Sequence, residues 1–184
     1  MSVALPLRIT FMGSPNFAIP ALRALQSEGH KVTLVVTQPD RPAGRGRKLQ
    51  MPPIKIEANT LNIPVFQPES FKNLDSVQTL AKASPDLIVV AAYGIILPKK
   101  VLEIPTLGTL NIHPSLLPRW RGPSPIQSAI LAGDGSTGIS IIFLNEEMDA
   151  GPILSQQEVV IAPSETMGEL EKRLAEIGAL ALTK

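Results

Sequence analysis

The sequence predicts an α/β fold with an open, doubly wound, mainly parallel sheet and helices on both faces of that sheet. Two observations predict it. Short runs of apolar and β-branched residues alternate along the chain with stretches of helical periodicity. These apolar runs are also nearly continuous instead of alternating with polar residues, which is typical of parallel strands that are buried on both faces.

The first elements show this pattern clearly. Strands are predicted at 7–12 (LRITFM) and 31–37 (KVTLVVT). Between them, NFAIPALRALQSEG places Phe17 and Leu22 on one helical face, and Gly29 is suited to end the helix. Further strands are expected at 87–92, 109–113, 138–144 and 153–161, and further helices at 54–62, 75–83, 124–132 and 166–182.

The composition fits one domain and excludes several kinds of site. The chain has 184 residues, of which 44% are hydrophobic, enough to bury a core. Its 17 Lys and Arg nearly balance 16 Asp and Glu, so a polyanionic partner would have to be recognised by a local cluster of charge. The lack of cysteine excludes disulfides and a cysteine nucleophile, and two histidines are too few for most metal sites. We therefore expect no bound metal.

Neither a targeting signal nor a membrane span is expected. The apolar run at the N-terminus is short and is interrupted by Pro6 and Arg8, which argues against a signal peptide. The longest apolar run, at 87–98, is far too short to cross a bilayer. A soluble, cytoplasmic protein is the expectation.

The turn after the first strand, FMGSPNFA, does not suit a dinucleotide. It carries one glycine where a dinucleotide-binding fold has G-x-G-x-x-G, so nicotinamide or flavin binding is not expected. Gly13 and Ser14 could still hold an anion at the start of the following helix. The alternative is that Ser14 and Pro15 simply form a tight turn between strand and helix.

Two polar residues interrupt the apolar strand predicted at 109–113. Asn111 and His113 are two positions apart, so their side chains share one face of the strand, about 7 Å apart. Pro114 cannot donate to a sheet, so the strand should end there with the polar pair at the carboxyl edge, where open α/β sheets bind ligands. Either residue alone would be interpreted as a buried polar group with a loop partner. Two together favour a functional site.

Asp149 is a third candidate, in the segment LNEEMDAGPI after the strand predicted at 138–144. An aspartate before Ala-Gly is commonly a turn residue. If its strand neighbours the strand of Asn111, however, the carboxylate would emerge at the same edge, close to His113. An amide and an imidazolium N–H can stabilise an oxyanion, while imidazole and carboxylate move protons, so the three residues suit acyl transfer without a covalent intermediate. Ser115 has neither a G-x-S-x-G context nor an evident base.

The segments NIHPSLLPRWRGPSPIQ (111–127) and MDAGPI (148–153) resemble the signature of the 10-formyltetrahydrofolate-dependent formyltransferases. The catalytic Asn, His and Asp of that family match Asn111, His113 and Asp149. The resemblance implies a Rossmann-like fold, with 10-formyltetrahydrofolate as the co-substrate.

The same resemblance implies a folate site. In the family, the segment that matches SLLP borders the folate, and AAYGIILP (91–98) resembles the apolar wall around the pterin ring. The residues expected to contact folate are Tyr93, Gly94, Ser115, Leu116, Leu117 and Pro118. Independently of the family, Tyr93 and Gly94 follow a buried strand at the carboxyl edge, where a flat ring could approach the backbone. Leu116 and Leu117 could instead be ordinary core residues.

The segment TQPDRPAGRGRKLQMPP (37–53) is polar and rich in Pro and Gly, which predicts a long exposed loop without regular structure. Its basic residues are Arg41, Arg45, Arg47 and Lys48. Such a charge run is usually a solvated face, but the glycines on either side of Arg45 would let it follow a phosphate backbone. The segment resembles an insertion of the family members that formylate initiator methionyl-tRNA, which implies tRNA binding by these four residues.

The resemblance covers essentially the whole chain. Full-length tRNA-specific members continue into a C-terminal β-barrel domain, so residues 1–184 are expected to be the catalytic domain alone. The hypothesis is transfer of a formyl group from 10-formyltetrahydrofolate to the α-amine of methionine on initiator methionyl-tRNA, by a monomer. Two alternatives stay open: formylation of a small amine such as glycinamide ribonucleotide, and an inactive fragment that only binds folate or RNA.

Overall fold

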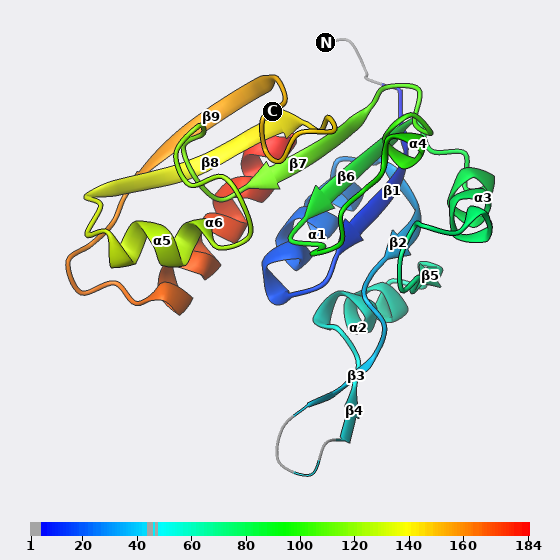
Figure 1. The fold of residues 1–184 in the computed structure, drawn as a ribbon, viewed down its shortest axis with the longest axis horizontal. Helices are drawn as coiled ribbons and strands as arrows, with labels where there is room; N and C mark the ends of the chain where they lie inside the picture. The colour runs from blue at the N-terminus through cyan, green and yellow to red at the C-terminus, as the bar shows by residue number, and fades with distance from the viewer. Residues whose placement is uncertain (1–4, 44–45, 47) are drawn as a thin grey trace.

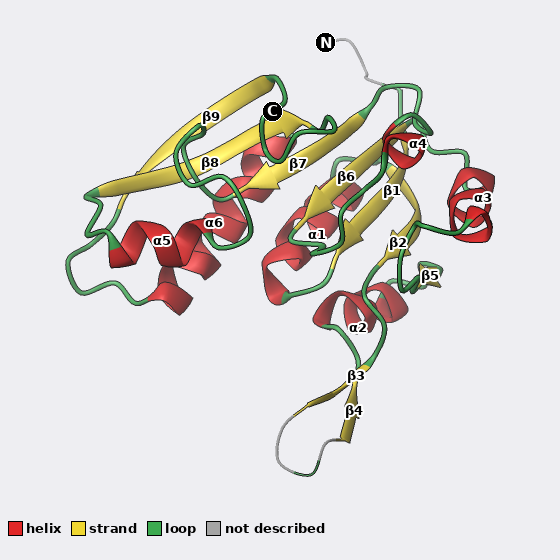
Figure 2. Ribbon diagram, viewed as in Figure 1, coloured by secondary structure: helices red, strands yellow, loops and turns green. Residues whose placement is uncertain are grey.

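The computed structural model describes residues 5–43, 46 and 48–184. At its centre is a seven-stranded sheet in the order β5-β2-β1-β6-β7-β8-β9 (Figure 1; Figure 2). The strands are β1 (Arg8–Gly13), β2 (Lys31–Val36), β5 (Val65–Phe66), β6 (Leu87–Ala91), β7 (Thr109–His113), β8 (Ser136–Phe143) and β9 (Ile153–Val160). The pairs from β5 to β7 are parallel, whereas β8 is antiparallel to both β7 and β9. The prediction of a mainly parallel sheet is confirmed.

Helices cover both faces of this sheet. One face carries α1 (Ile19–Ser27), which follows the short 3-10 helix η1 (Asn16–Ala18), together with α2 (Pro53–Thr60), α5 (Pro125–Leu131) and α6 (Met167–Leu182). The other carries α3 (Leu74–Lys82) and α4 (Lys99–Leu102). Successive residues of β1 mark the division, because Phe11 packs with Leu22 of α1 while Met12 packs in the cluster of Leu80 from α3. No helix in the described ranges is long and apolar enough to span a membrane.

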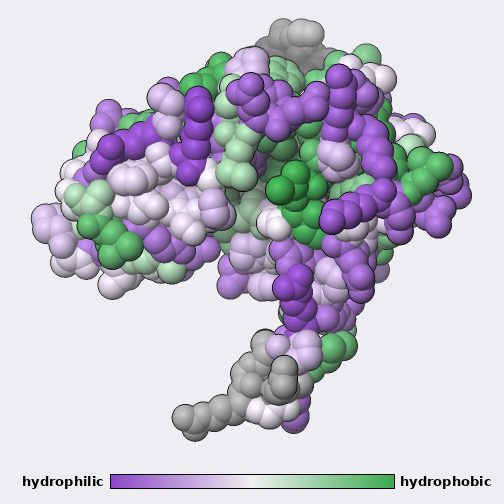
Figure 3. Space-filling model, in the orientation of Figure 1, coloured by the Kyte–Doolittle hydropathy of each residue, from purple (hydrophilic) through white to green (hydrophobic). Residues whose placement is uncertain are grey.

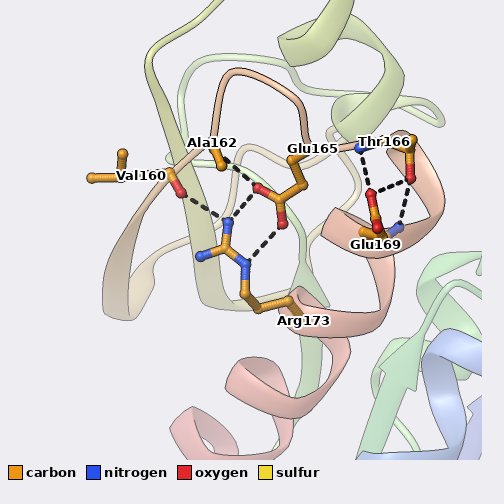
Figure 4. Close-up of polar contacts among 6 residues, drawn as sticks. All are labelled: Val160, Ala162, Glu165, Thr166, Glu169 and Arg173. Atoms are coloured by element: carbon orange, nitrogen blue, oxygen red, sulfur yellow. Dashed lines mark hydrogen bonds and ion pairs between the residues drawn. The ribbon is translucent and has the colours of Figure 1, made fainter.

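Polar contacts fix the start of α6. The Thr166 hydroxyl accepts a hydrogen bond from the backbone N–H of Glu169, and the Glu169 carboxylate accepts one from the backbone N–H of Thr166, at 3.4 and 2.9 Å (Figure 4). Just before this capping box, Glu165 accepts two hydrogen bonds from Arg173, whose guanidinium also donates to the carbonyl of Val160. The helix is thereby tied to the end of β9.

The basic segment differs from the prediction. Residues 37–53 were expected to lack regular structure, yet they contain β3 (Arg41–Ala43) paired antiparallel with β4 (Lys48–Gln50). The prediction was wrong because a charged, proline-containing run has low strand propensity, and its pairing depends on the facing strand. In Figure 1 this hairpin projects away from the central sheet. The two-residue strand β5 and the short helix α4 are likewise absent from the elements that the apolar pattern predicts.

A close contact between α6 and β7 gives a test of the packing. A Cβ added at Gly178 would lie 2.7 Å from Cγ2 of Ile112, whereas one added at Gly168, in the same helix, would meet nothing within 4 Å. Gly178→Val should therefore lower the free energy of unfolding by about 1–3 kcal/mol through overpacking. Gly168→Val should change it by less than about 0.5 kcal/mol. Urea unfolding measures both, and equal losses would contradict the tight contact at Ile112.

Candidate active site

The carboxyl ends of β6 and β7 border a cavity of about 510 Å³. It is lined by residues 92–97 after β6, residues 111–114 at the end of β7, residues 122–123, and residues 144–149 after β8, among others. This is the position at which open α/β sheets bind ligands, and the volume suits a small organic molecule. In Figure 3 hydrophobic side chains gather near the middle of the viewed face, over the segment that follows β6.

Three of the predicted residues meet at the wall of this cavity. Asn111 and His113 extend from β7 on the same face, as the two-residue spacing predicts, while Leu110 and Ile112 join the core around α6. The Asn111 amide donates to Oδ1 of Asp149 at 3.4 Å, and Nδ1 of His113 lies 3.6 Å from Oδ2 of Asp149. One carboxylate therefore contacts both polar residues of the strand.

Asp149 reaches this position by a route that differs from the expectation. Because β8 is antiparallel to β7, its last residue, Phe143, lies opposite Leu110 and not at the carboxyl edge of β7. The segment 144–149 lines the cavity together with His113 and so carries Asp149 to the polar pair. Asp149 itself has a left-handed backbone, with φ of 47°, and its Oδ2 accepts a hydrogen bond from the backbone N–H of Gly122 at 2.9 Å.

His113 is held in one orientation. Its side chain is almost fully buried, and Nε2 lies 3.0 Å from the backbone carbonyl oxygen of Trp120. A carbonyl only accepts, so this contact requires the hydrogen on Nε2. Nδ1 is then the nitrogen that faces Asp149 and is available to bind or release a proton.

Tyr93 and Gly94 line the cavity, as predicted for a ligand wall. The Tyr93 ring packs in the core beside α3 and α4, and burial raises the pKa of its phenol. Its backbone carbonyl accepts hydrogen bonds from Nε2 of Gln38, at 2.9 Å, and from the Ser14 hydroxyl, at 3.3 Å. Gly94 has φ of 78°, and a Cβ there would lie 2.6 Å from Nε2 of Gln38, so glycine suits this position. The first turn thus supports the cavity wall through Ser14.

The structure places Ser115, Leu116, Leu117 and Pro118 outside the set of residues that line this cavity. Leu117 is buried, and its N–H donates to the hydroxyl of Ser140 on β8 at 3.1 Å. A Cβ at Gly138, also on β8, would clash with the Leu116 side chain. These residues join the loop after His113 to the sheet, and Pro114 is the member of the loop that borders the cavity.

The basic residues lie elsewhere. Arg41 and Lys48 are exposed on the projecting hairpin of β3 and β4, while Arg45 and Arg47 lie outside the described residues. Among the described residues that line the cavity, none belongs to this hairpin. Within the same described part of the chain, no group of three or more His, Cys, Asp or Glu side chains is arranged to hold a metal ion.

Several functional positions escape prediction from the sequence. Trp120 and Gly122 contribute backbone groups, a carbonyl to His113 and an N–H to Asp149, and both have left-handed φ values, 59° and 96°. Glycine at 122 is a usable signal for such a turn, but nothing in the sequence marks Trp120. Ile96 and Met148 line the cavity while 82% and 61% exposed, so apolar surface is open to a ligand there.

The arrangement has the groups that an acyl transfer requires. The Asn111 amide is a fixed donor for an oxygen that gains negative charge, and Nδ1 of His113 beside the Asp149 carboxylate can exchange a proton. Apolar residues, among them Ile95, Leu97 and Leu144, line the cavity around these polar groups.

Comparison with curated proteins agrees with this geometry. Methionyl-tRNA formyltransferase of Stenotrophomonas maltophilia (strain K279a) is 53% identical over 177 residues, which are 96% of this chain and 57% of the relative. The enzyme of the same name from Chloroflexus aurantiacus (strain ATCC 29366 / DSM 635 / J-10-fl) is 54% identical over 173 residues, which are 94% of this chain and 56% of that protein. The chain thus spans a little over half the length of these relatives.

A solved structure and a family comparison also indicate a formyltransferase. Phosphoribosylglycinamide formyltransferase from Bacillus halodurans superimposes with a TM-score of 0.77 at 26% identity, covering 96% of this chain and 91% of that one. The sequence matches the formyl transferase family over residues 7–184. With the predicted fold and the polar cluster at the sheet edge, these matches show that the chain belongs to the formyl transferase family.

Proposed function

We propose that this chain is the catalytic domain of a cytoplasmic, monomeric enzyme that transfers a formyl group from 10-formyltetrahydrofolate to the α-amine of methionine on initiator methionyl-tRNA. The observation that carries the proposal is the contact of one carboxylate, that of Asp149, with both Asn111 and His113 at the wall of an apolar cavity. The names of the relatives, methionyl-tRNA formyltransferases at 53% and 54% identity, support this acceptor.

The volume and the apolar lining of the cavity support a folate as the formyl donor. Its volume of about 510 Å³ suits part of a large organic ligand, and its apolar wall includes Ile95, Leu97 and Leu144. Tyr93 and Gly94 belong to the same wall, directly after the carboxyl end of β6. Tyr93 and Gly94 are therefore proposed to contact the pterin ring. Four residues after Pro114 are proposed to support the folate site indirectly, by holding the loop that borders the cavity: Ser115, Leu116, Leu117 and Pro118.

The side chains can be assigned roles in the transfer. The acceptor amine attacks the formyl carbon, a new C–N bond forms, and the bond from that carbon to N10 of the folate breaks. Asn111 stabilises the oxyanion that develops on the formyl oxygen. The amine loses one proton and the departing N10 gains one, and Nδ1 of His113, which lies beside the Asp149 carboxylate, carries this exchange.

The basic hairpin supports a tRNA as the formyl acceptor. Arg41 and Lys48 are exposed on strands that project from the body, and Arg45 and Arg47 lie between them in sequence. Such a basic projection suits the phosphate backbone of a tRNA. The second candidate, formylation of a small amine such as glycinamide ribonucleotide, is favoured by the likeness to phosphoribosylglycinamide formyltransferase, but at 26% identity against more than 50% for the tRNA enzymes.

The two acceptors can be tested side by side. This chain would be given 10-formyltetrahydrofolate with either initiator methionyl-tRNA or glycinamide ribonucleotide at low ionic strength. Formylation of the tRNA alone is expected. Formylation of the ribonucleotide would favour the second candidate, and folate binding without transfer to either acceptor would identify a binding fragment without activity.

Replacement of Arg45 by alanine tests the hairpin. If its guanidinium neutralises one phosphate, Arg45→Ala should weaken tRNA binding and reduce the slope of log K against log salt by about 1. The affinity for folate should stay unchanged, because the folate site lies on other elements. Lys82→Ala, on α3, removes an exposed positive charge far along the chain from the hairpin and is the matched control. An equal effect of the two substitutions on tRNA binding would contradict the role of the hairpin.

A further inference from the structure

We propose that Trp120 and Asp134 are positioning residues for His113. In this arrangement the Asp134 carboxylate anchors Trp120, and the backbone carbonyl of Trp120 holds the imidazole with its hydrogen on Nε2. The catalytic meaning of the inference rests on the proposed formyl transfer, but the structural arrangement does not. Neither residue lines the cavity that holds Asn111, His113 and Asp149.

Asp134 lies between α5 and β8 and accepts three hydrogen bonds from two adjacent residues. Nε1 of Trp120 donates to Oδ2 at 2.7 Å, while Nε and Nη2 of Arg119 donate to Oδ2 and Oδ1 at 3.0 and 2.6 Å. The Arg119 guanidinium also lies 4.3 Å from the centre of the Trp120 ring. The bonds from Arg119, and then that from Trp120, hold the pKa of the Asp134 carboxyl below its usual range. The acceptor is therefore a carboxylate at neutral pH.

This anchoring explains an unfavourable backbone conformation. Trp120 has φ of 59°, a left-handed conformation that is unfavourable for a bulky L-residue. The indole bond to Asp134 fixes the side chain of this residue. On the preceding peptide, the carbonyl of Arg119 accepts a hydrogen bond from the buried hydroxyl of Ser115 at 2.6 Å. Two contacts therefore fix the direction of the Trp120 carbonyl: the indole bond to Asp134 and the bond from Ser115 to the preceding carbonyl.

The direction of that carbonyl decides which nitrogen of His113 carries the hydrogen. With the carbonyl 3.0 Å from Nε2, the hydrogen is placed on Nε2 and the lone pair of the neutral ring is on Nδ1, beside Asp149. If the indole were released, the strained peptide could relax and the carbonyl could turn away. The Asp149 carboxylate, 3.6 Å from Nδ1, would then favour the tautomer with its hydrogen on Nδ1, and fewer molecules would have Nδ1 free to take a proton.

The two histidines of the chain make this measurable by NMR. In a protein labelled with ¹⁵N-histidine, long-range ¹H–¹⁵N spectra distinguish protonated from unprotonated ring nitrogens, and His30 is an internal reference. Nδ1 of His30 accepts a hydrogen bond from the N–H of Leu7 and lies far from the proposed cluster along the chain. We expect Trp120→Phe and Asp134→Asn to shift the His113 signals towards mixed tautomers and to leave those of His30 unchanged.

Glu165→Gln is the matched control. Glu165 accepts two hydrogen bonds from Arg173 of α6, at 2.9 and 2.6 Å, in the same kind of Arg–carboxylate pair, but it makes no hydrogen bond to the loop of Trp120 (Figure 4). Its replacement should destabilise the fold in the way that loss of an ion pair does, while the His113 signals stay unchanged. If Glu165→Gln moves the His113 signals as far as Asp134→Asn does, the specific role of the cluster is overturned.

The same variants connect the arrangement to catalysis. For Trp120→Phe and Asp134→Asn, kcat should fall by about 10- to 100-fold while KM for 10-formyltetrahydrofolate changes less than about threefold, because the reacting groups are misplaced and the folate wall is intact. Unchanged His113 signals in both variants would overturn the inference, even if the wild-type chain transfers formyl groups. A wild-type chain that transfers none, with His113 signals that still respond, would overturn the proposed function alone.

Discussion

The carboxylate of Asp149 is the contact on which the site depends. It accepts a hydrogen bond from Asn111 of β7, faces Nδ1 of His113, and accepts another hydrogen bond from the backbone N–H of Gly122. It therefore joins the strand, the loop after the strand and the segment after β8. Without this carboxylate, Asn111 and His113 would have no common partner. The loop after β7 and the segment after β8 would also lose the hydrogen bond between Gly122 and Asp149 that joins them.

The backbone around the site is strained at several positions. Left-handed φ values occur at Ala92, Gly94, Trp120, Gly122 and Asp149. For the three that are not glycine, the conformation costs roughly 1–3 kcal/mol each and persists only where surrounding contacts enforce it. Polar contacts supply that enforcement, at Asp149 through Gly122 and at Trp120 through Asp134. The close packing of Gly178 of α6 against Ile112 supports strand β7, which carries Asn111 and His113. Preorganisation of this kind is what stabilisation of a transient oxyanion requires.

Much of this structure could be predicted from the sequence, because strands and helices leave a periodic pattern of apolar residues. Nearly continuous apolar runs predicted the parallel strands, and the two-residue spacing of Asn111 and His113 predicted that they share a face. The path to Asp149 could not be predicted, because the antiparallel direction of β8 is set by long-range pairing and not by local pattern. The contributions of Trp120 and Gly122 come from backbone groups, which exist at every position and leave no mark in a sequence. The β3–β4 hairpin was missed because its strands lack apolar alternation.

The most direct measurement is a double-mutant cycle on the Asp149 contact, using Asn111→Ala, Asp149→Asn and the double variant, with kcat/KM for formyl transfer to initiator methionyl-tRNA as the readout. Loss of the Asn111 amide alone should cost about 100- to 1000-fold in turnover. Since the carboxylate acts largely through the hydrogen bond that it accepts from Asn111, the double variant should be only slightly worse than the more damaging single one. A loss in the double variant equal to the product of the two single losses would show that the residues act independently, which contradicts the account.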